Sequence, residues 1–586
     1  MMSQADQTPR PIAAESSSPS VAAADTATTT TRIGPFAWLI ATTRELGSFC
    51  IQHRFWTAMM LLFIVTWTIE LYWLQAHTLV YPNETSASYN MWAPKIRLAL
   101  DVLFISGVTF ALRRRWLIPT VIASSVIYLS LLTYFKYFHK PISLLTMTTN
   151  WREGMHIGGF AWDMFPRGAA LLLLLALAIK LAALLLSRKD TMPRSCARLA
   201  ASVFLVGYIA LYAVANRLDP LHYIQTTRGV GRIGHIRGYL GPWFAEWYYL
   251  RNDQLLDEMV EQRKVVYDAL SPLEADIPIH PRLVIVQAES LDNNILDFTV
   301  NGEEVTPFLN GLRRESMYYR VGAMHFLGSA DADFAALTGV AGSRRANSYS
   351  IPGYPYQNTT PQMLENRGFD IYAFHGYSGE FYSRRSAYVQ MGFTKINFQE
   401  ELEAEYELPT GQWGVNGRDV MRLSAELLND AKPPVCHFLI TLTTHTPYKQ
   451  LPPTERELFL EPASTAEQYL NNMRYLDNCL REYLAALGDG TTVVIYADHP
   501  TEVFTGFTPD RDLEMNREFV PCLIYDSDRD LSKLQKTRDE PVSTDGSLNL
   551  VDFINYVRGQ VERNFPPVDE SPAETSSEVP LQEQST

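Results

Sequence analysis

The chain has 586 residues, a length that suits two or three domains rather than one. Its net charge of −14 comes without a basic stripe in the second half, which argues against nucleic acid as a partner, because phosphate binding needs clustered Lys and Arg. The five cysteines are scattered and have no zinc-type spacing, so they predict no disulfide framework, although one bridge among Cys436, Cys479 and Cys522 stays open.

The first part of the chain is predicted to be a membrane domain that follows a disordered tail. Residues 1–31 are rich in Ala, Ser, Thr and Pro and lack the apolar core of a signal peptide, which is typical of a disordered cytoplasmic tail. Apolar segments within residues 32–216 approach the roughly 20 residues that cross a bilayer. We expect five spans, at about 56–76, 97–113, 116–136, 168–187 and 197–216.

Basic residues near the span ends predict the orientation, because cytoplasmic loops are enriched in Lys and Arg. Two such clusters separate spans two and three and spans four and five: Arg113, Arg114 and Arg115, and then Arg188, Lys189, Arg194 and Arg198. Five spans then place the N-terminus in the cytoplasm and everything after residue 216 outside. We therefore predict a multi-pass protein of the plasma membrane, the inner membrane of a Gram-negative cell envelope, with a periplasmic or extracellular second half.

A connector and a second domain follow the spans. Residues 217–279 are expected to be a juxtamembrane helical linker, since aromatic residues that suit a membrane interface precede a polar helical stretch. The Pro-punctuated segment 271–281 ends it, so a second domain is expected over 280–562. The Pro-, Ser- and Glu-rich residues 563–586 are predicted to be a disordered tail.

Four apolar stretches of the second domain each deliver a residue suited to metal binding or acid–base chemistry. They are RLVIVQAES (282–290) with Glu289, FDIYAFHGY (369–377) with His375, HFLITLTTHTPY (437–448) with His445 and TVVIYADHP (492–500) with Asp498 and His499. Helical patterns lie between them, which predicts an α/β domain with a mostly parallel sheet flanked by helices. Because ligands of such sheets gather at the carboxyl ends of the strands, we expect one shared site there.

This ordered set of motifs resembles the alkaline phosphatase and sulfatase superfamily. Within it, the sequence is most similar to the lipoteichoic acid synthases and related membrane phosphoglycerol transferases. The resemblance rests on five pieces in the family's order: VIVQAES (284–290), GSADADF (328–334), FHG-x4-FYSR (374–384), THTPY (444–448) and YADH (496–499). The five-span first part followed by an extracytoplasmic domain also resembles that family.

The resemblance implies a set of site residues. Ser329 matches the nucleophile, a position held by threonine in the lipoteichoic acid synthases, and GSADADF also lacks their lysine. One divalent metal is implied, usually Mn²⁺ in these synthases and Zn²⁺ in the phosphoethanolamine transferases, with Mg²⁺ as a further alternative. Its implied ligands are Glu289, Ser329, Asp498 and His499, and the groups implied to hold the substrate are His375, Tyr382, Arg384 and His445.

The chemistry of these residue types agrees with the resemblance. A divalent metal lowers the pKa of a hydroxyl and polarises a phosphoryl oxygen, so it can activate Ser329. Arg384 can clamp phosphate oxygens, and His445 can protonate a leaving alkoxide. Asp331 and Asp333 are expected to be structural, hydrogen-bonding the loop and capping the helix that follows.

The expected activity is transfer of a phosphoglycerol group from a phospholipid donor, phosphatidylglycerol, to a hydroxyl of a glycan or polymer acceptor through a covalent Ser329 intermediate. Three alternatives stay open. The first is a phosphoethanolamine transferase that acts on lipid A or a glycan. The second is a sulfatase-like hydrolase, although SADAD lacks the Pro and Arg of the sulfatase C/S-x-P-x-R motif. The third is a catalytically degenerate domain that only binds sugar or lipid.

Overall fold

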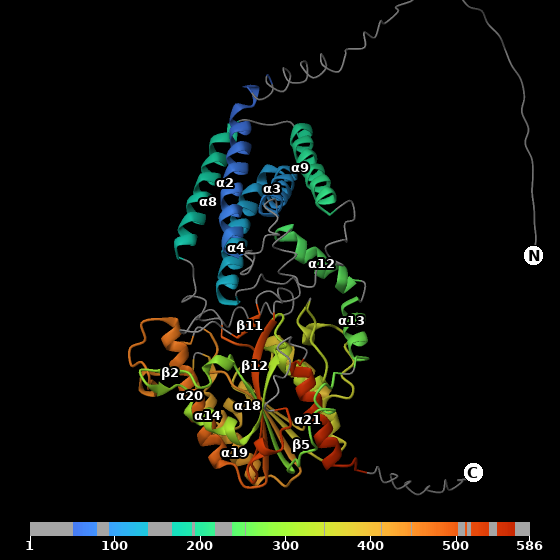
Figure 1. The fold of residues 1–586 in the computed structure, drawn as a ribbon. Coiled ribbons are helices and arrows are strands. Elements are labelled where there is room, and N and C mark those ends of the chain that lie inside the picture. The colour runs from blue at the N-terminus through green and yellow to red at the C-terminus, as the bar shows by residue number, and fades with distance from the viewer. Residues whose placement is uncertain are drawn as a thin grey trace, which may run out of the picture.

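The computed structural model describes most of the chain between residues 48 and 568. The described residues are 48, 51–78, 93–138, 167–189, 194–216, 237–251, 254–265, 267–344, 346–411, 413–446, 448–501, 510–512, 517–537 and 548–568. The predicted tail over 1–31 and most of the one over 563–586 lie outside them. Figure 1 shows a helical bundle at one end of the molecule and an α/β domain at the other.

The bundle accounts for the apolar first part of the chain. Its helices are α2 (Arg54–Thr78), α3 (Ala93–Ala111), α4 (Arg114–Phe138), α8 (Arg167–Leu186) and α9 (Arg194–Ala215). Large apolar side chains such as Leu171, Leu174 and Leu186 are exposed on their outer surface. A soluble protein does not expose apolar faces of this extent, so the chain is a membrane protein.

The predicted number of five spans is not confirmed. Within the described residues, four helices are long and apolar enough to cross a membrane, and they lie in α2, α4, α8 and α9. The predicted span 97–113 does form a helix, α3, which packs against α2 and α9. Three charged residues, Lys95, Arg97 and Asp101, lie in α3, whereas the apolar stretch of each of the four candidate spans carries at most two.

The α/β domain is built on one large sheet in the strand order β11-β12-β10-β1-β9-β5-β6, with β4 also paired to β12. Strands β10 (Thr491–Ala497), β1 (Arg282–Ala288), β9 (Val435–Ile440), β5 (Asp370–His375) and β6 (Lys395–Asn397) run parallel. Strands β12 (Arg517–Asp526), β4 (Met317–Gly322) and β11 (Arg511–Asp512) form an antiparallel margin. The mostly parallel sheet confirms the predicted fold class of this domain.

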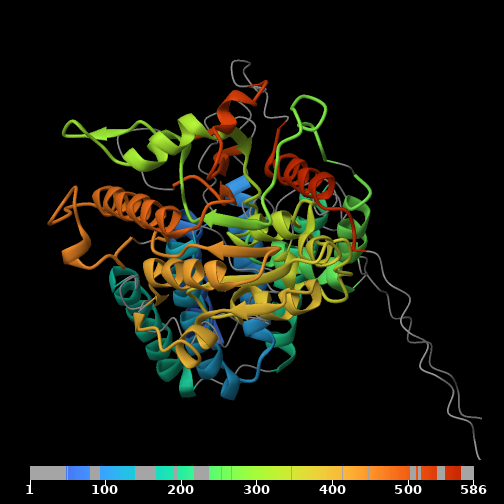
Figure 2. The same cartoon turned by 90° about the horizontal axis from the view of Figure 1, so that it is seen from below.

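Both faces of the sheet are covered, as is usual for parallel strands. Every residue of β9 and β10 is buried, which is why these strands are continuous apolar runs rather than alternating patterns. Figure 2 shows the sheet with helices on either side of it. One group of helices comprises α14 (Pro307–Glu315), α19 (Gly417–Asp430) and α20 (Thr465–Ala486), and a second comprises α15 (Ala330–Thr338), α16 (Thr360–Glu365) and α21 (Leu550–Asn564).

Two further features bear on the sequence predictions. Helices α12 (Leu240–Arg251) and α13 (Gln254–Gln262) lie inside the predicted linker 217–279, between the bundle and the α/β domain (Figure 1). Cys436, Cys479 and Cys522 are buried and free, so the bridge that the sequence left open does not form.

Candidate metal and catalytic site

Glu289, Asp498 and His499 meet at the carboxyl edge of the parallel sheet. Glu289 follows β1, and Asp498 and His499 follow β10, which pairs with β1 so that Ala288 lies opposite Ala497. One ligand atom from each of the three residues lies within 4.8 Å of the other two. His499 Nε2 is 3.4 Å from Glu289 Oε1 and 3.5 Å from Asp498 Oδ2. The predicted metal ligands on the two strands are therefore neighbours.

The hydrogen bonds around this group leave suitable atoms for a metal ion. Asp498 Oδ1 accepts from the backbone N–H groups of Ser290 and His499, at 2.8 and 2.9 Å. Asp498 Oδ2 is buried and accepts no hydrogen bond in the part of the chain that the structure describes. His499 Nδ1 lies 2.8 Å from the carbonyl oxygen of Pro500, to which it can only donate, so Nε2 is the nitrogen that faces the carboxylates. Two carboxylates and one imidazole nitrogen fit Mn²⁺ or Zn²⁺.

The electrostatics of the group also favour a bound cation. Burial, together with the negative charge of Glu289, raises the pKa of Asp498 to about 7. Burial acts against the charged form of His499, but Asp498 and Glu289 raise the pKa of His499 to about 10. Burial would also raise the pKa of Glu289, yet the charges of His445 and His499 hold it well below its usual range. Two neighbouring buried carboxylates need positive charge nearby, and a divalent ion supplies it.

Ser329 lies in a loop that Asp331 organises. The Asp331 carboxylate accepts hydrogen bonds from the backbone N–H groups of Phe326, Leu327 and Gly328, at 2.9, 2.6 and 3.3 Å. Ser329 directly precedes α15, and its side chain makes no capping bond to the first turn of that helix. The loop-forming role predicted for Asp331 is confirmed.

The loop is also tied to the sheet. Gln287 Nε2 donates to the carbonyl oxygen of Ser329 at 3.4 Å. Gln287 lies near the end of β1 and precedes Glu289 by two residues. The structure thus places the backbone of Ser329 beside the carboxyl end of β1.

Arg384 is held by Asp333. Because the bonds that Asp333 accepts come from side chains and not from the N–H groups of a helix end, the prediction that Asp333 caps a helix is wrong. Arg384 Nε donates to Asp333 Oδ2 at 2.9 Å, and Nη2 donates to Oδ1 at 3.3 Å. The hydroxyls of Tyr349 and Tyr388 also donate to Asp333, at 3.1 and 2.7 Å. Burial disfavours the charged guanidinium, but Asp333 keeps the pKa of Arg384 above its usual value. Arg384 is therefore a buried, oriented cation that uses two of its five N–H groups on Asp333.

The other predicted substrate-binding residues come from neighbouring strand ends and loops. His375 ends β5, and its Nδ1 lies 3.2 Å from the carbonyl oxygen of Ile440. Burial and then the charge of Arg384 lower the pKa of His375 to about 3, so this imidazole is neutral. His445 follows β9, with Nδ1 2.7 Å from the carbonyl oxygen of Thr446. Tyr382 has φ = 58°, and its hydroxyl packs so closely on Gly328 that a Cβ there would collide with it.

The structure adds residues that the sequence reasoning did not assign. The ring of His325 stacks on that of His499 with centroids 4.2 Å apart, and His325 Nδ1 pairs with Glu518 at 2.8 Å. The ring of Trp413 lies 5.2 Å from that of His445. His325 stands in the same motif as Ser329 and could have been suspected from it, whereas Trp413 lies in no motif and becomes visible only in the fold.

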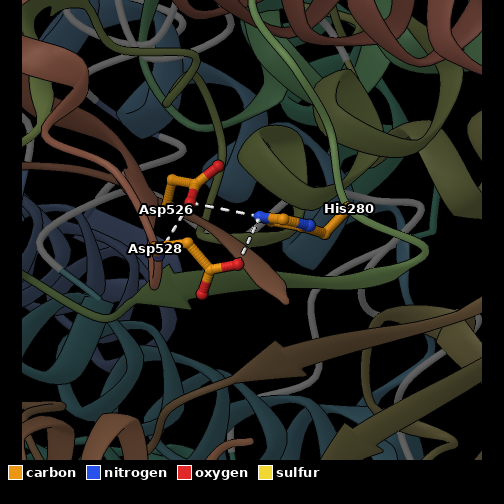
Figure 3. Close-up of side chains that lie close together, drawn as sticks. All are labelled: His280, Asp526 and Asp528. Carbon is orange, nitrogen blue, oxygen red and sulfur yellow. Dashed lines mark hydrogen bonds and ion pairs between the residues drawn. The ribbon is translucent and has the colours of Figure 1, made fainter. Parts of the chain in front are cut away.

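A second acidic group with a histidine lies elsewhere in the domain. His280 Nε2 is 3.1 Å from Asp526 Oδ1 and 3.5 Å from Asp528 Oδ2 (Figure 3). His280 precedes β1 and Asp526 ends the antiparallel β12, so this group is at the amino edge of the parallel strands. The Asp528 carboxylate also accepts from the backbone N–H of Gly490 at 3.1 Å. These contacts join the turn after β12 to the starts of β1 and β10.

Comparison with known proteins finds a family match and several relatives. The sulfatase family, as a sequence profile, matches residues 281–556. A lipoteichoic acid synthase of Staphylococcus saprophyticus is 29% identical over 234 residues, which cover 37% of this chain and 35% of that protein. The chain thus spans about a third of the length of that curated relative.

Two solved structures give weaker likenesses. A lipoteichoic acid synthase structure from Listeria monocytogenes superposes with a TM-score of 0.39 at 20% identity, over 46% of this chain and 71% of the other. A lipooligosaccharide phosphoethanolamine transferase from Neisseria meningitidis gives a TM-score of 0.45 at 13% identity, over 80% and 88%.

Proposed function

We propose that the protein is a membrane-anchored enzyme that transfers phosphoglycerol groups. The premise is that residues 281–556 match the sulfatase family of the alkaline phosphatase superfamily. The donor would be phosphatidylglycerol, and the acceptor a hydroxyl of a glycan or polymer. One observation carries the proposal above all. Glu289, Asp498 and His499 converge at the carboxyl edge of the sheet and leave a buried Asp498 oxygen without a hydrogen bond among the described residues.

One divalent metal ion, Mn²⁺ or Zn²⁺, would be held by Glu289, Asp498 and His499, with Ser329 as a fourth ligand. When bound, such an ion lowers the pKa of a nearby hydroxyl and stabilises negative charge on phosphoryl oxygens. The remaining steps belong to side chains of this chain. Asp331 holds the loop that presents Ser329, and the bond from Gln287 fixes that loop to the sheet.

In the first half of the proposed reaction, Ser329 Oγ gives its proton to solvent and forms a bond to the phosphorus of the lipid. The bond from phosphorus to the diacylglycerol oxygen breaks, and His445 supplies the proton that diacylglycerol takes. In the second half, the acceptor hydroxyl forms a bond to phosphorus and gives its proton to His445. The bond from phosphorus to Ser329 breaks, and Ser329 regains a proton from solvent.

The remaining site residues would bind the phosphoglycerol headgroup. Arg384 carries a permanent charge in a buried position, and Asp333 orients it so that its other N–H groups can bind phosphate oxygens. His375 is neutral and Tyr382 brings a hydroxyl to the loop at Gly328, so both can hydrogen-bond uncharged oxygens of the headgroup.

We further propose that α3 is a fifth membrane span, with the N-terminus in the cytoplasm and the α/β domain outside. The charged side chains of Arg97 and Asp101 are buried, so they face the bundle rather than lipid. Asp101 accepts a hydrogen bond from Gln75 at 2.6 Å, which satisfies part of its charge within the bundle. A bundle attached to the domain would keep the site at the height of lipid headgroups.

The test uses the full chain in detergent with Mn²⁺ and either phosphatidylglycerol or phosphatidylethanolamine. Intact-mass analysis should find a phosphoglycerol adduct with phosphatidylglycerol on the wild type and none on Ser329→Ala. An adduct only with phosphatidylethanolamine would replace the proposal with a phosphoethanolamine transferase. If neither lipid gives an adduct and no metal copurifies, the domain is not this enzyme.

A further inference from the structure

The ring of His325 lies face to face with the ring of His499, a candidate metal ligand. The two ring centroids are 4.2 Å apart, and the ring planes are inclined by only 19°. The side chain of His325 is 7% exposed, so solvent has little access to its side of the stack. Because the orientation of a ligating imidazole decides where its nitrogen meets the metal, a group that fixes this ring plane also acts on the metal site.

His499 is restrained in two directions that complement each other. Its Nδ1 donates to the carbonyl oxygen of Pro500 at 2.8 Å, and this bond acts within the plane of the ring. The stack on His325 acts perpendicular to that plane, so it opposes tilting of the ring. With both restraints in place, His499 Nε2 faces the carboxylates of Glu289 and Asp498, at 3.4 and 3.5 Å.

Glu518 in β12 holds His325 from behind. His325 Nδ1 lies 2.8 Å from Glu518 Oε2, and because a carboxylate accepts, His325 donates through this nitrogen. The backbone of Glu518 is itself fixed on both sides. Its carbonyl oxygen accepts from the N–H of Ala323 at 2.8 Å, and Glu518 pairs with Arg511 of β11. A continuous line of contacts thus runs from the antiparallel margin of the sheet through His325 to His499.

His325 also belongs to the loop that presents Ser329. It precedes Ser329 by four residues, and the three residues between them all donate their backbone N–H groups to the carboxylate of Asp331. These bonds make the loop a single unit with His325 at one end and Ser329 at the other. His325 therefore joins the loop of the candidate nucleophile to the candidate metal ligand.

We propose that His325 is a positioning residue of the metal site. Held by Glu518, it keeps the ring of His499 in the orientation that binds a divalent cation. His325 and Glu518 act through His499 and are not themselves ligands. The inference rests on the proposed function, because it takes Glu289, Asp498 and His499 as the metal ligands. If the pair only filled space in the core, its loss would lower stability and leave metal affinity unchanged.

Metal affinity tests this role without turnover. The full chain in detergent would be stripped of metal and titrated with Mn²⁺, followed by the EPR signal of the free ion, and with Zn²⁺ against a coloured chelator. We expect His325→Ala to weaken binding of the metal about 10-fold, as the loss of a group that orients a metal ligand does. His325→Phe keeps an aromatic ring against His499 and should recover most of the affinity.

The matched control is His280→Ala. His280 is also paired with carboxylates, but at the opposite edge of the same sheet, so its loss should leave metal affinity unchanged. Glu518→Ala tests the line of contacts from the other end, because it removes the support of His325 and leaves both rings in place. It should weaken metal binding in the same direction as His325→Ala, but by less.

The unfolding midpoint of each metal-free variant separates positioning from folding. Lower midpoints with unchanged metal affinity in both His325→Ala and Glu518→Ala would overturn the inference, and so would an affinity of His325→Phe as low as that of His325→Ala. The proposed transfer can fail on its own. A chain whose metal affinity depends on His325, but which forms no adduct on Ser329 with either lipid, would keep this inference and lose that function.

Discussion

At the scale of single residues, the buried histidines of the α/β domain differ according to the charges beside them. His499 faces two carboxylates, so its pKa rises to about 10 despite burial. His375 is buried near Arg384, and its pKa falls to about 3. His437 in β9 is fully buried between the rings of Tyr372 and Phe374, and burial lowers its pKa to about 3 as well. The protonation state of a buried histidine in this domain therefore depends on the charges beside it.

His437 gives a pH prediction. Between pH 6.5 and about 3 the unfolded chain binds a proton at this residue that the folded chain does not, so its contribution to stability is complete above pH 6.5 and is lost as pH falls. At pH 5 the loss is about 2 kcal/mol for one such histidine. In His437→Phe, the free energy of unfolding from urea titrations should fall by about 2 kcal/mol less between pH 7.5 and pH 5 than in the wild type. An identical fall in both proteins would show that His437 is protonated in the fold.

At the scale of elements, the pair of Asp333 in α15 and Arg384 at the start of α17 (Arg384–Met391) links two helices beneath the site. Asp333→Asn would leave a buried guanidinium without its countercharge, which costs about 3 kcal/mol. We expect a lower unfolding midpoint and no adduct on Ser329. Adding Arg384→Met should recover most of the stability, because it removes the unpaired charge, but not the adduct. Recovery of both would mean that Arg384 has no part in binding phosphate.

The sequence predicts the strand ends of the site but not the pair of Asp333 and Arg384. Apolar runs that end in Glu289, His375 and Asp498 could be predicted as strands and gathered at one edge, because parallel strands buried on both faces leave that signature. Asp333 and Arg384 are 51 residues apart, and no local pattern shows which acid neutralises which base. The antiparallel strands β4 and β12 are not predicted either, because β4 mixes buried and exposed residues and β12 carries Pro521 inside its apolar run.

At the scale of the whole molecule, residues 237–239, which lead into α12, bind the chain to the bundle ahead of the α/β domain. Arg237 Nε donates to Asn216 Oδ1 at the end of α9, at 3.2 Å. The backbone N–H of Tyr239 donates to Asp101 Oδ2 in α3 at 3.2 Å, and the Tyr239 hydroxyl bonds Thr78 at the end of α2. One short segment ahead of α12 thus contacts three helices, which explains why a charged residue such as Asp101 is present in α3.

Gly238 makes this attachment testable. Its φ is +78°, and a Cβ would collide with the carboxylate of Asp101, so Gly238→Ala is strained on both counts. We expect this variant to keep both folded parts but to lose about 10-fold in transfer from phosphatidylglycerol in vesicles, because the site would no longer be held at a fixed height. Hydrolysis of a water-soluble phosphodiester should stay at the wild-type rate. Equal losses with both substrates would instead mean that Gly238 affects the catalytic site itself, and an unchanged vesicle rate would mean that this attachment does not position the domain.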